Sequence, residues 1–389
     1  MSEWLSYTIG EIAAHAKSAL ATGPFGSAVS SKNFRSSGVP MLRGSNLTEE
    51  VGTRLNETDL VYLDPVLAET FSRSTARRGD LIFTCWGSVG QIGLVDASSQ
   101  YESYIVSNKQ MKLTPNSEIV DSTFLYYYLS QPSMVFEVQS RAIGSTIPGF
   151  NLGQLRSLQV SLPAIDEQRA IAEVLGALDD KIAANTKLAE TSARLASSVF
   201  SETLEIERSS KQLKLVAQNV PGKYLPKDEY VEDGDYFVYG SNSVMGKYDR
   251  YLCAGNFTVL AKIGSYCGNL RWSQRPAWVN NNASAIVPLE GVNPWILRHA
   301  LENLDMGPHR AGTGQPYVRM ESLFSAEVDL PSPACSERIS PSLESLAETE
   351  AVAIEENRTL AATRDTLLPQ LMSGKLRVKD IEHTMGEMV

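Results

Sequence analysis

The chain has 389 residues, enough for two or three domains with separate hydrophobic cores. Hydrophobic residues make up 43% and charged residues 21%, a composition typical of globular proteins that excludes a disordered or fibrous chain. Taken alone, the net charge of -10 argues against a nucleic-acid partner. Most of the excess acid, however, lies in residues 164–207 and 334–389, and a nearly neutral remainder can still present a basic face to DNA.

The sequence shows no pattern of a secretory signal peptide or of a membrane-spanning segment. The N-terminal stretch MSEWLSYTIGEIAAHAKSALATG carries two glutamates and no apolar core, unlike a secretory signal peptide. No window approaches the roughly 18 apolar residues of a membrane span. Cys85, Cys253, Cys267 and Cys335 show no CxxC spacing, so we expect reduced, half-buried thiols in a cytoplasmic protein.

Residues 1–163 are predicted to form a first domain with short strands and mixed α+β structure, because they are rich in Gly, Asn and β-branched residues. Gly79–Thr84 indicates an apolar strand that is entered from a turn. The following Gly87-Ser-Val-Gly90-Gln-Ile-Gly93 has the spacing GxxGxxG and not the GxGxxG of a dinucleotide fold. We therefore interpret it as tight turns within a sheet.

A long helix is predicted over residues 164–207, starting after Pro163 ends a strand, with acid in its first turn. Apolar or small residues recur along it at alternating steps of three and four, which is a heptad seam. The seam positions are Ile171, Leu175, Leu178, Ile182, Asn185, Leu188 or Ala189, Ser192, Ala196 and Val199. So thin a seam on so long a helix requires a partner helix.

The second half of the chain repeats the first in the same order. Residues 208–333 are predicted to be a second domain, in which Tyr239-Gly-Ser-Asn242 parallels Arg43-Gly-Ser-Asn46, and Val279–Ala283 parallels Val106–Gln110. Residues 334–389 are predicted to supply the partner helix and a tail, with seam residues Ile354, Asn357, Leu360, Leu367 and Leu371. Antiparallel pairing of the two helices gives an α+β protein with pseudo-twofold symmetry; two unrelated amphipathic helices are the alternative.

The sequence contains no recognisable catalytic constellation. The four histidines are scattered without metal-ligand spacing, and there is no phosphate-binding loop or nucleophile elbow. Asn293-Pro294-Trp295 resembles part of an adenine methyltransferase motif but lacks its second proline, so a helix-opening turn is the better interpretation. We expect no metal and no catalysis on this chain.

The predicted loops carry residue types that suit recognition of base edges and phosphates. Asn and Gln pair with adenine in the major groove, and Arg and Lys with guanine or phosphate. The candidates are Arg43, Ser45, Asn46, Arg77, Arg78, Asn108, Lys109, Gln110, Thr146, Tyr239, Ser241, Asn242, Lys262, Arg271, Asn280, Asn281, Asn282, Gln315, Tyr317 and Arg319. For each, a solvated side chain or a turn residue is the alternative.

Several of these segments, in their order, resemble the specificity (S) subunit of type I restriction-modification systems over essentially the whole chain. Leu162-Pro-Ala-Ile-Asp-Glu-Gln-Arg-Ala-Ile171 is similar to the opening of the family's central helix, and Leu367-Leu-Pro-Gln-Leu-Met-Ser-Gly374 to its terminal motif. Arg43–Leu47, Gly79–Ile82 and Gly87–Gly90 resemble elements of its target recognition domains. The second helix opening departs from the family, because Ser336-Glu-Arg replaces Glu-Gln-Arg and Pro341 intrudes, we expect within the first turn.

The resemblance implies a non-catalytic subunit that reads a split DNA site, one half per domain, with the helix pair setting the unread spacer. It implies two modification (M) subunits that bind S-adenosylmethionine and methylate adenine, and restriction (R) subunits that use ATP and Mg²⁺. A coiled-coil scaffold with two protein-binding modules is the competing hypothesis, and a chain that is itself a nuclease or methyltransferase is a third.

Overall fold

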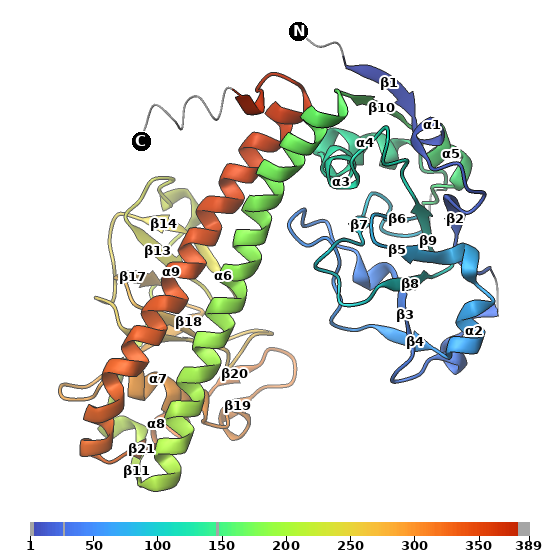
Figure 1. The fold of residues 1–389 in the computed structure, drawn as a ribbon. Coiled ribbons are helices and arrows are strands. Elements are labelled where there is room, and N and C mark those ends of the chain that lie inside the picture. Colours follow the sequence, from blue (N-terminus) through green and yellow to red (C-terminus); the bar gives the residue numbers. More distant parts are fainter. Residues whose placement is uncertain (1–3, 26–27, 145–147, 380–389) are drawn as a thin grey trace. The chain divides into compact units, whose positions relative to one another are not determined.

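The computed structural model describes residues 4–25, 28–144 and 148–379, which divide into two compact units (Figure 1). Unit 1 comprises the chain up to Asn185 together with the segment from Glu356 onward, and unit 2 comprises Thr186–Glu355. Each unit therefore contains one region of sheets and one half of each of the two long helices. None of the helices in the described ranges is long and apolar enough to cross a membrane.

Unit 1 contains two four-stranded sheets and a strand pair. The first sheet has the order β2 (Leu20–Thr22), β9 (Gln110–Leu113), β6 (Leu81–Thr84) and β7 (Ile92–Leu94). The second has the order β4 (Val61–Leu63), β3 (Val39–Leu42), β8 (Ser103–Val106) and β5 (Thr75–Arg77). β1 (Leu5–Thr8) pairs antiparallel with β10 (Gln159–Leu162), which leads into the first long helix. The predicted strand at Gly79–Thr84 is β6.

Most helices of unit 1 share one core with its first sheet. They are α1 (Ile9–Ile12), α3 (Ser122–Ser130), α4 (Pro132–Arg141), α5 (Leu152–Arg156) and parts of the long helices α6 (Ile165–Ile206) and α9 (Pro333–Met372). The short helix α2 (Pro65–Glu69) packs instead against the second sheet through Ala68. Phe83 of the sheet and Phe124 of α3 are at most 2% exposed, and Ile171 of α6 and Leu371 of α9 join the same buried cluster. Each such side chain contributes roughly 1.5–3 kcal/mol on burial, so the helix pair is part of the domain core.

Unit 2 repeats this topology. Its first sheet has the order β12 (Ala217–Pro221), β18 (Ala283–Pro288), β15 (Phe257–Ala261) and β16 (Leu270–Ser273). Its second has the order β14 (Val244–Tyr248), β13 (Tyr236–Tyr239) and β17 (Ala277–Val279), and β13 pairs parallel with β17 as β3 does with β8. β11 (Arg208–Gln212) pairs antiparallel with β21 (Glu327–Pro331), as β1 does with β10. The structure thus confirms the duplication, and adds the short pair β19 (Arg310–Ala311) and β20 (Tyr317–Val318).

The core of unit 2 again joins its sheet to the long helices. Its short helices are α7 (Pro294–Glu302) and α8 (Met320–Phe324). Asn293 caps α7 by accepting hydrogen bonds from the backbone N–H groups of Trp295 and Ile296, which confirms the helix-opening turn. Trp295 packs in one buried cluster with Phe200 of α6 and Leu343 of α9.

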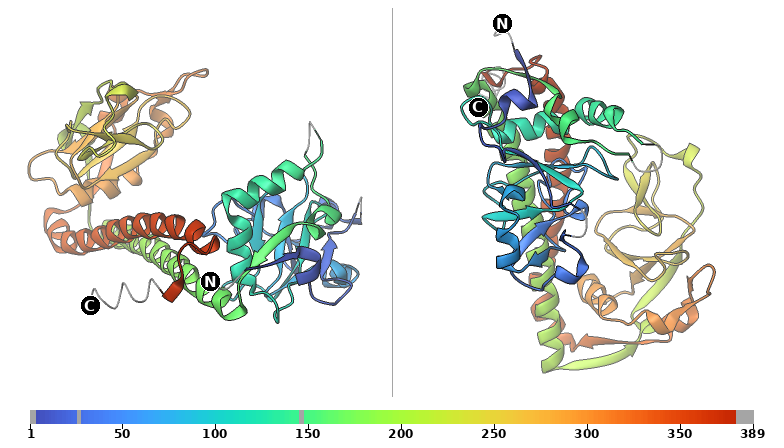
Figure 2. Two further views of the ribbon diagram at one scale, coloured as in Figure 1. Left: turned by 90° about the horizontal axis from the view of Figure 1, so that it is seen from above. Right: turned by 90° about the vertical axis from the view of Figure 1, so that its right-hand side faces the viewer.

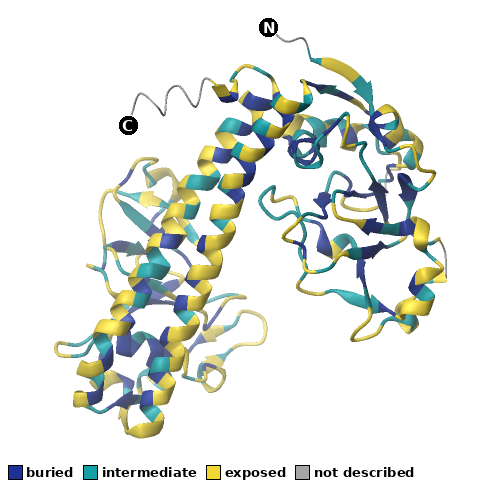
Figure 3. Cartoon of the chain, viewed as in Figure 1, coloured by how far each residue is buried: buried dark blue, intermediate teal, exposed yellow. Residues whose placement is uncertain are grey.

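The long helices run antiparallel within each unit (Figures 1 and 2). In unit 1, Asp179 of α6 binds Arg364 of α9, and the later residue Asn185 of α6 binds the earlier residue Glu356 of α9, as antiparallel helices require. In unit 2, Glu207 at the end of α6 accepts a hydrogen bond from Ser332, next to the start of α9. Buried and exposed residues alternate along both helices, as a heptad seam requires (Figure 3).

The structure contradicts the predicted burial of two seam residues and the predicted position of one proline. Leu188 is 47% exposed and Ile354 is 42% exposed, and their neighbours Ala189 and Ala353 are buried instead. Ala189 continues the four- and three-residue steps from Asn185 to Ser192, and Ala353 continues those toward Asn357. The buried seam therefore keeps its heptad spacing, and Leu188 and Ile354 lie one residue off it. Pro341 is also not in the first turn, because α9 begins eight residues earlier, at Pro333.

Candidate nucleic-acid interface

The candidate residues of unit 1 gather where the two sheets meet. Arg43 follows β3 and Ser107 follows β8, and these two parallel strands are neighbours, so both loops leave the sheet at the same edge. β9 begins at Gln110, opposite Thr84 at the end of β6. The turn from Gly87 to Gly90 lies beside them, and its glycines have φ of 90° and 106°, which side-chain-bearing residues rarely adopt.

These segments enclose a pocket of about 460 Å³, within the range of roughly 300–1,000 Å³ typical of ligand sites. It contains five of the predicted residues: Arg43, Ser45, Asn108, Lys109 and Gln110. It also contains Thr84, Trp86 and Gln91, which the sequence analysis did not select. The structure therefore brings together most of the first domain's candidates, from two separate stretches of chain, beside a third stretch that was not predicted.

Other candidates in unit 1 have structural partners or lie elsewhere. Asn46 is 1% exposed; its side chain accepts a hydrogen bond from the backbone N–H of Arg43 and donates one to the carbonyl of Asn56. Arg78 pairs with Glu102 on the surface, 3.0 Å away, and Arg77 is exposed at the end of β5; neither lines the pocket. Thr146 lies outside the described residues.

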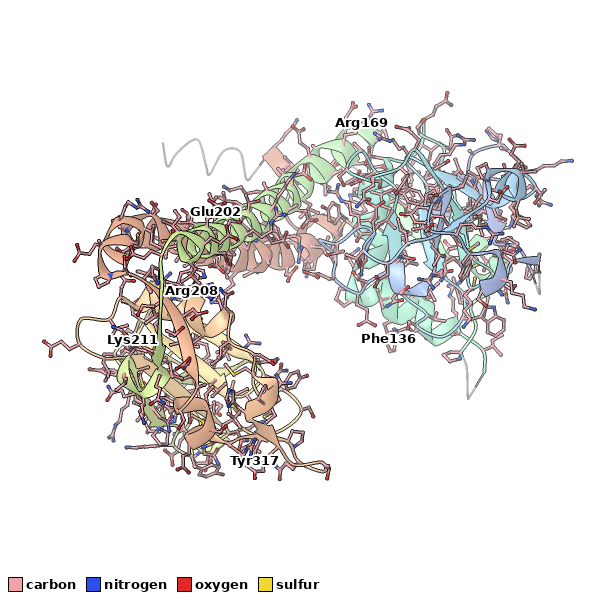
Figure 4. The ribbon with its side chains drawn as sticks, turned by 90° about the horizontal axis from the view of Figure 1, so that it is seen from below. Phe136, Arg169, Glu202, Arg208, Lys211 and Tyr317 are labelled. Carbon is pink, nitrogen blue, oxygen red and sulfur yellow. The ribbon has the colours of Figure 1, made fainter. Side chains whose placement is uncertain are left out.

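Unit 2 assembles its candidates at the corresponding sheet edge. The Ser241 hydroxyl, just after β13, lies 2.8 Å from the carbonyl oxygen of Asn282 and 3.2 Å from that of Ile263. The carbonyl of Lys262 accepts a hydrogen bond from the N–H of Val318, next to Tyr317. Arg271 donates to the carbonyl of Asn242. Tyr317 projects at the edge of the unit and is 45% exposed (Figure 4).

The remaining candidates of unit 2 divide into exposed and structural residues. Asn281, Asn282 and Gln315 are exposed, as is Arg319, whose guanidinium donates to the carbonyl of Pro308. Asn280 is 5% exposed, and its side chain donates to the carbonyl of Leu225 and accepts from the N–H of Asn281. Asn280 therefore orders the loop and does not reach its surface.

Neither region has the chemistry of a metal centre or a thiol nucleophile. No group of three or more His, Cys, Asp or Glu side chains in the described part of the chain could hold a metal ion. Cys85, beside the pocket of unit 1, is buried, and this burial raises the pKa of its thiol to about 12. The thiol is thus neutral near pH 7 and is a poor nucleophile.

Comparison with known proteins shows the family to which this chain belongs. The family model described as the type I restriction modification DNA specificity domain matches residues 1–191 and 207–362, one match for each sheet region. The chain belongs to this family. The MjaVIII type I restriction enzyme specificity subunit of Methanocaldococcus jannaschii is 22% identical over 322 residues, covering 71% of this chain and 75% of the relative.

Two further similarities agree with this assignment. A putative type I specificity subunit of Mycoplasma pneumoniae is 25% identical over 313 residues, covering 73% of this chain and 80% of its own. The crystal structure of the type I restriction-modification S subunit from M. genitalium superposes with a TM-score of 0.68 over 95% of this chain and 96% of that one, at 18% identity. At this identity the superposition shows the shared fold. The chain is thus a type I specificity subunit with two DNA recognition domains.

Sequence reasoning missed the pocket residues that come from the β6–β7 hairpin. Trp86 directly precedes the Gly87–Gly90 turn, and its 51% exposure is unusual for so large an aromatic side chain. An aromatic residue beside a glycine turn was the signal available in the sequence. Thr84 and Gln91 gave no such signal, because their place depends on the strand register.

Proposed function

We propose that each sheet region reads one half of a bipartite DNA site, and that the paired helices set the unread spacer between the halves. The observation that carries the proposal is the topological duplication: each unit places exposed amide and basic side chains at the same edge of the same pair of sheets. Two similar readers joined through paired helices fit a split recognition sequence. Contacts with base edges give the specificity, and contacts with phosphates give the affinity.

In this proposal the chain recognises the DNA sequence, and its partner subunits carry out methylation and cleavage. Two M subunits bind S-adenosylmethionine and methylate adenine, and R subunits add cleavage with ATP and Mg²⁺ in the cytoplasm. The exposed faces of α6 and α9, which carry residues such as Arg169 and Glu202 (Figure 4), are the proposed docking surfaces for the M subunits.

A domain exchange tests whether each domain recognises its half of the site independently. Residues 1–163 are replaced by the matching domain of a relative, and the complex with its M subunits methylates genomic DNA that is then sequenced for modified bases. We expect one half of the methylated site to change and the other half and the spacer to stay the same. A simultaneous change in both halves contradicts the proposal.

Salt dependence separates this proposal from the protein-binding scaffold. Specific binding of the complex to duplex DNA should weaken steeply as salt rises, because neutralised phosphates release counterions. Binding that does not depend on DNA sequence, measured by gel shift against an unrelated duplex, supports the scaffold.

A further inference from the structure

The pocket of unit 1 holds an unusual concentration of unpaired polar atoms. In the described residues, buried side-chain nitrogen or oxygen atoms without a hydrogen-bond partner include Arg43 Nε, Thr84 Oγ1, Gln91 Oε1 and Gln110 Nε2. All four residues line this one pocket. A buried polar group without a partner costs about 1–3 kcal/mol. Four of them converging on one concavity therefore indicate a polar ligand that satisfies them.

At the pocket floor, the unpaired donor Nε2 of Gln110 faces into the pocket. Gln110 is 0% exposed and Thr84 is 2% exposed, and the two residues face each other across the β6–β9 pairing. The side-chain oxygen of Gln110 accepts a hydrogen bond from the Ser107 hydroxyl. This bond fixes the carboxamide so that Nε2 faces Gly44, where an added Cβ atom would lie 3.6 Å from it, in the pocket wall.

The depth of these groups determines which ligand can reach them. Side chains that read an intact duplex must project into the major groove, because the base edges lie at its floor. A fully buried amide at the bottom of a pocket does not project. The ligand must instead enter the pocket, and a base does so only after it leaves the helical stack.

The rim of the pocket suits such a base. Trp86 is 51% exposed and packs closely over Gly149, where an added Cβ atom would lie 2.6 Å from the indole. An indole face held in this way can stack on any base, a contact worth about 1–3 kcal/mol. The exposed Lys109 adds a positive charge for a neighbouring phosphate.

We infer that the unit 1 pocket accepts one nucleobase displaced from the duplex, with Gln110 and Thr84 as specificity-determining residues at its floor. The inference rests on the proposed DNA recognition and adds a mode of reading to it. Gln110 Nε2 donates to an acceptor on the base, and Gln91 Oε1 accepts from a donor on it. Such a contact rejects a base whose edge leaves these groups unpaired.

The duplicated domain supplies an internal comparison. The strand pairing that places Thr84 opposite Gln110 places Ala261 opposite Ala283 in unit 2. Both alanines are at most 2% exposed and have no polar side-chain atom. The Ser241 hydroxyl in the corresponding loop is already within hydrogen-bond distance of the Asn282 carbonyl. The inference therefore concerns the first half-site, where this register position carries polar side chains.

The test uses the chain assembled with its M subunits on a duplex that carries its methylated site. 2-Aminopurine, whose fluorescence rises when it leaves the stack, replaces one base at a time in the half-site read by domain 1. We expect a several-fold rise at one position with the wild-type complex, and loss of most of that rise with Gln110→Met or Thr84→Val. Thr258→Val is the matched control, because Thr258 is equally buried at 3% and lies outside the pocket.

The outcomes separate the inference from the proposed function. No rise at any position of this half-site, with sequence-specific binding intact, overturns the inference and leaves the proposed function standing. A rise at the methylated adenine that survives Gln110→Met belongs to methyl transfer and also overturns it. Failure of the wild-type complex to prefer its site over an unrelated duplex overturns the proposed function instead. Thr84→Val keeps the side-chain shape, so a folding defect in Gln110→Met does not prevent the test.

Discussion

The carboxylate of Asp179 ties three helices of unit 1 together. It accepts hydrogen bonds from Arg364 of α9, at 2.7 Å, and from the Tyr127 hydroxyl of α3. The Tyr127 hydroxyl also lies 3.3 Å from Arg54 Nη2, and Arg54 pairs with Asp96. Burial and the nearby Asp179 charge raise the pKa of Tyr127, so its hydroxyl stays protonated and donates. The recognition domain and both helices thus share one buried polar network.

Asp179→Asn is expected to destabilise unit 1 by about 3 kcal/mol, because it leaves the buried Arg364 without its charged partner on α6. The measurement is the thermal unfolding midpoint of the chain in complex with its M subunits. Asp180→Asn is the control: its side chain is 74% exposed, and the change should stay within about 0.5 kcal/mol. Equal effects of the two variants contradict the role of the network.

Asp96 predicts an acid-dependent part of this stability. Burial alone raises its pKa, but hydrogen bonds from Ser98 and Arg54 outweigh burial and lower the pKa below its usual value. A carboxyl with a lowered pKa contributes stability that is complete above the unfolded pKa of about 3.9 and is lost as pH falls through the folded pKa. The stability gap between wild type and Asp96→Asn should therefore be constant from pH 5 to 8 and shrink below about pH 4. A gap at pH 3 that is as large as at pH 7, measured by urea unfolding, contradicts this assignment.

Single residues show what the sequence could and could not predict. Asn293 before Pro294 indicated a helix start, because a cap depends only on neighbouring residues, and the structure has that cap. Asn46 and Asn280 carry the same amide but are buried in loop-ordering hydrogen bonds. Gln91 enters the pocket through the β6–β7 pairing. Such roles depend on contacts between distant segments, which local sequence does not record.

At the scale of elements, the helix seam contains polar side chains that favour one register over others. Asn185 is 3% exposed and donates to Glu356 at 2.7 Å, and Asn357 donates to the carbonyl of Ile182 at 3.1 Å. The hydrogen bond from Asn185, followed by that from Lys181, lowers the pKa of the exposed Glu356. A buried amide in a seam selects register at a loss of stability.

Asn185→Leu is expected to raise the unfolding midpoint by a few degrees, about 1 kcal/mol, while weakening the preference for one register. The second effect is measured as a wider range of spacers in the methylated sites. Leu188→Ala, at a 47% exposed position three residues away, should change neither quantity. A lower unfolding midpoint with unchanged spacers shows that Asn185 serves stability and not register.

The extent of the seam marks another limit of sequence reasoning. The heptad spacing predicted which faces of α6 and α9 are buried. Leu188 and Ile354 are exposed because they lie one residue off the alternating steps, which Ala189 and Ala353 continue. Pro341 was predicted to lie in the first helical turn, but α9 begins eight residues before it. Helix starts are set by caps and by the preceding strand, and β21 ends at Pro331, well before this proline.

At the scale of the whole molecule, the duplication was the most informative feature of the sequence. Short motifs matched weakly, but their common order predicted two copies of one domain, and the strand orders β2-β9-β6-β7 and β12-β18-β15-β16 confirm it. The differences between the copies could not be predicted in this way. The α4 helix and the β5 edge strand of unit 1 lie where the motifs do not match.

If the paired helices set the spacer, a change in their length must change the recognised site. Four residues add ~6 Å to a helix, which corresponds to about one or two base pairs of B-DNA at ~3.4 Å each. Four residues are inserted after Asn185 in α6 and four before Glu356 in α9, because these two side chains are partners and the paired insertions keep the later contacts aligned. We expect methylated sites with both half-sites unchanged and a spacer longer by one or two base pairs.

The control carries the same four residues at the exposed turn of Glu290 and Gly291, where the chain can lengthen without displacing a neighbouring atom. This variant should methylate the original site. An unchanged spacer in the helix variant, with methylation retained, means that the M subunits or the DNA itself fix the distance. Loss of one half-site alone indicates that the four residues, by adding about 40° of helical rotation, turned one reader away from the groove. Because rotation and length change together in any insertion, a seven-residue pair that restores the helical phase to within about 20° separates the two effects.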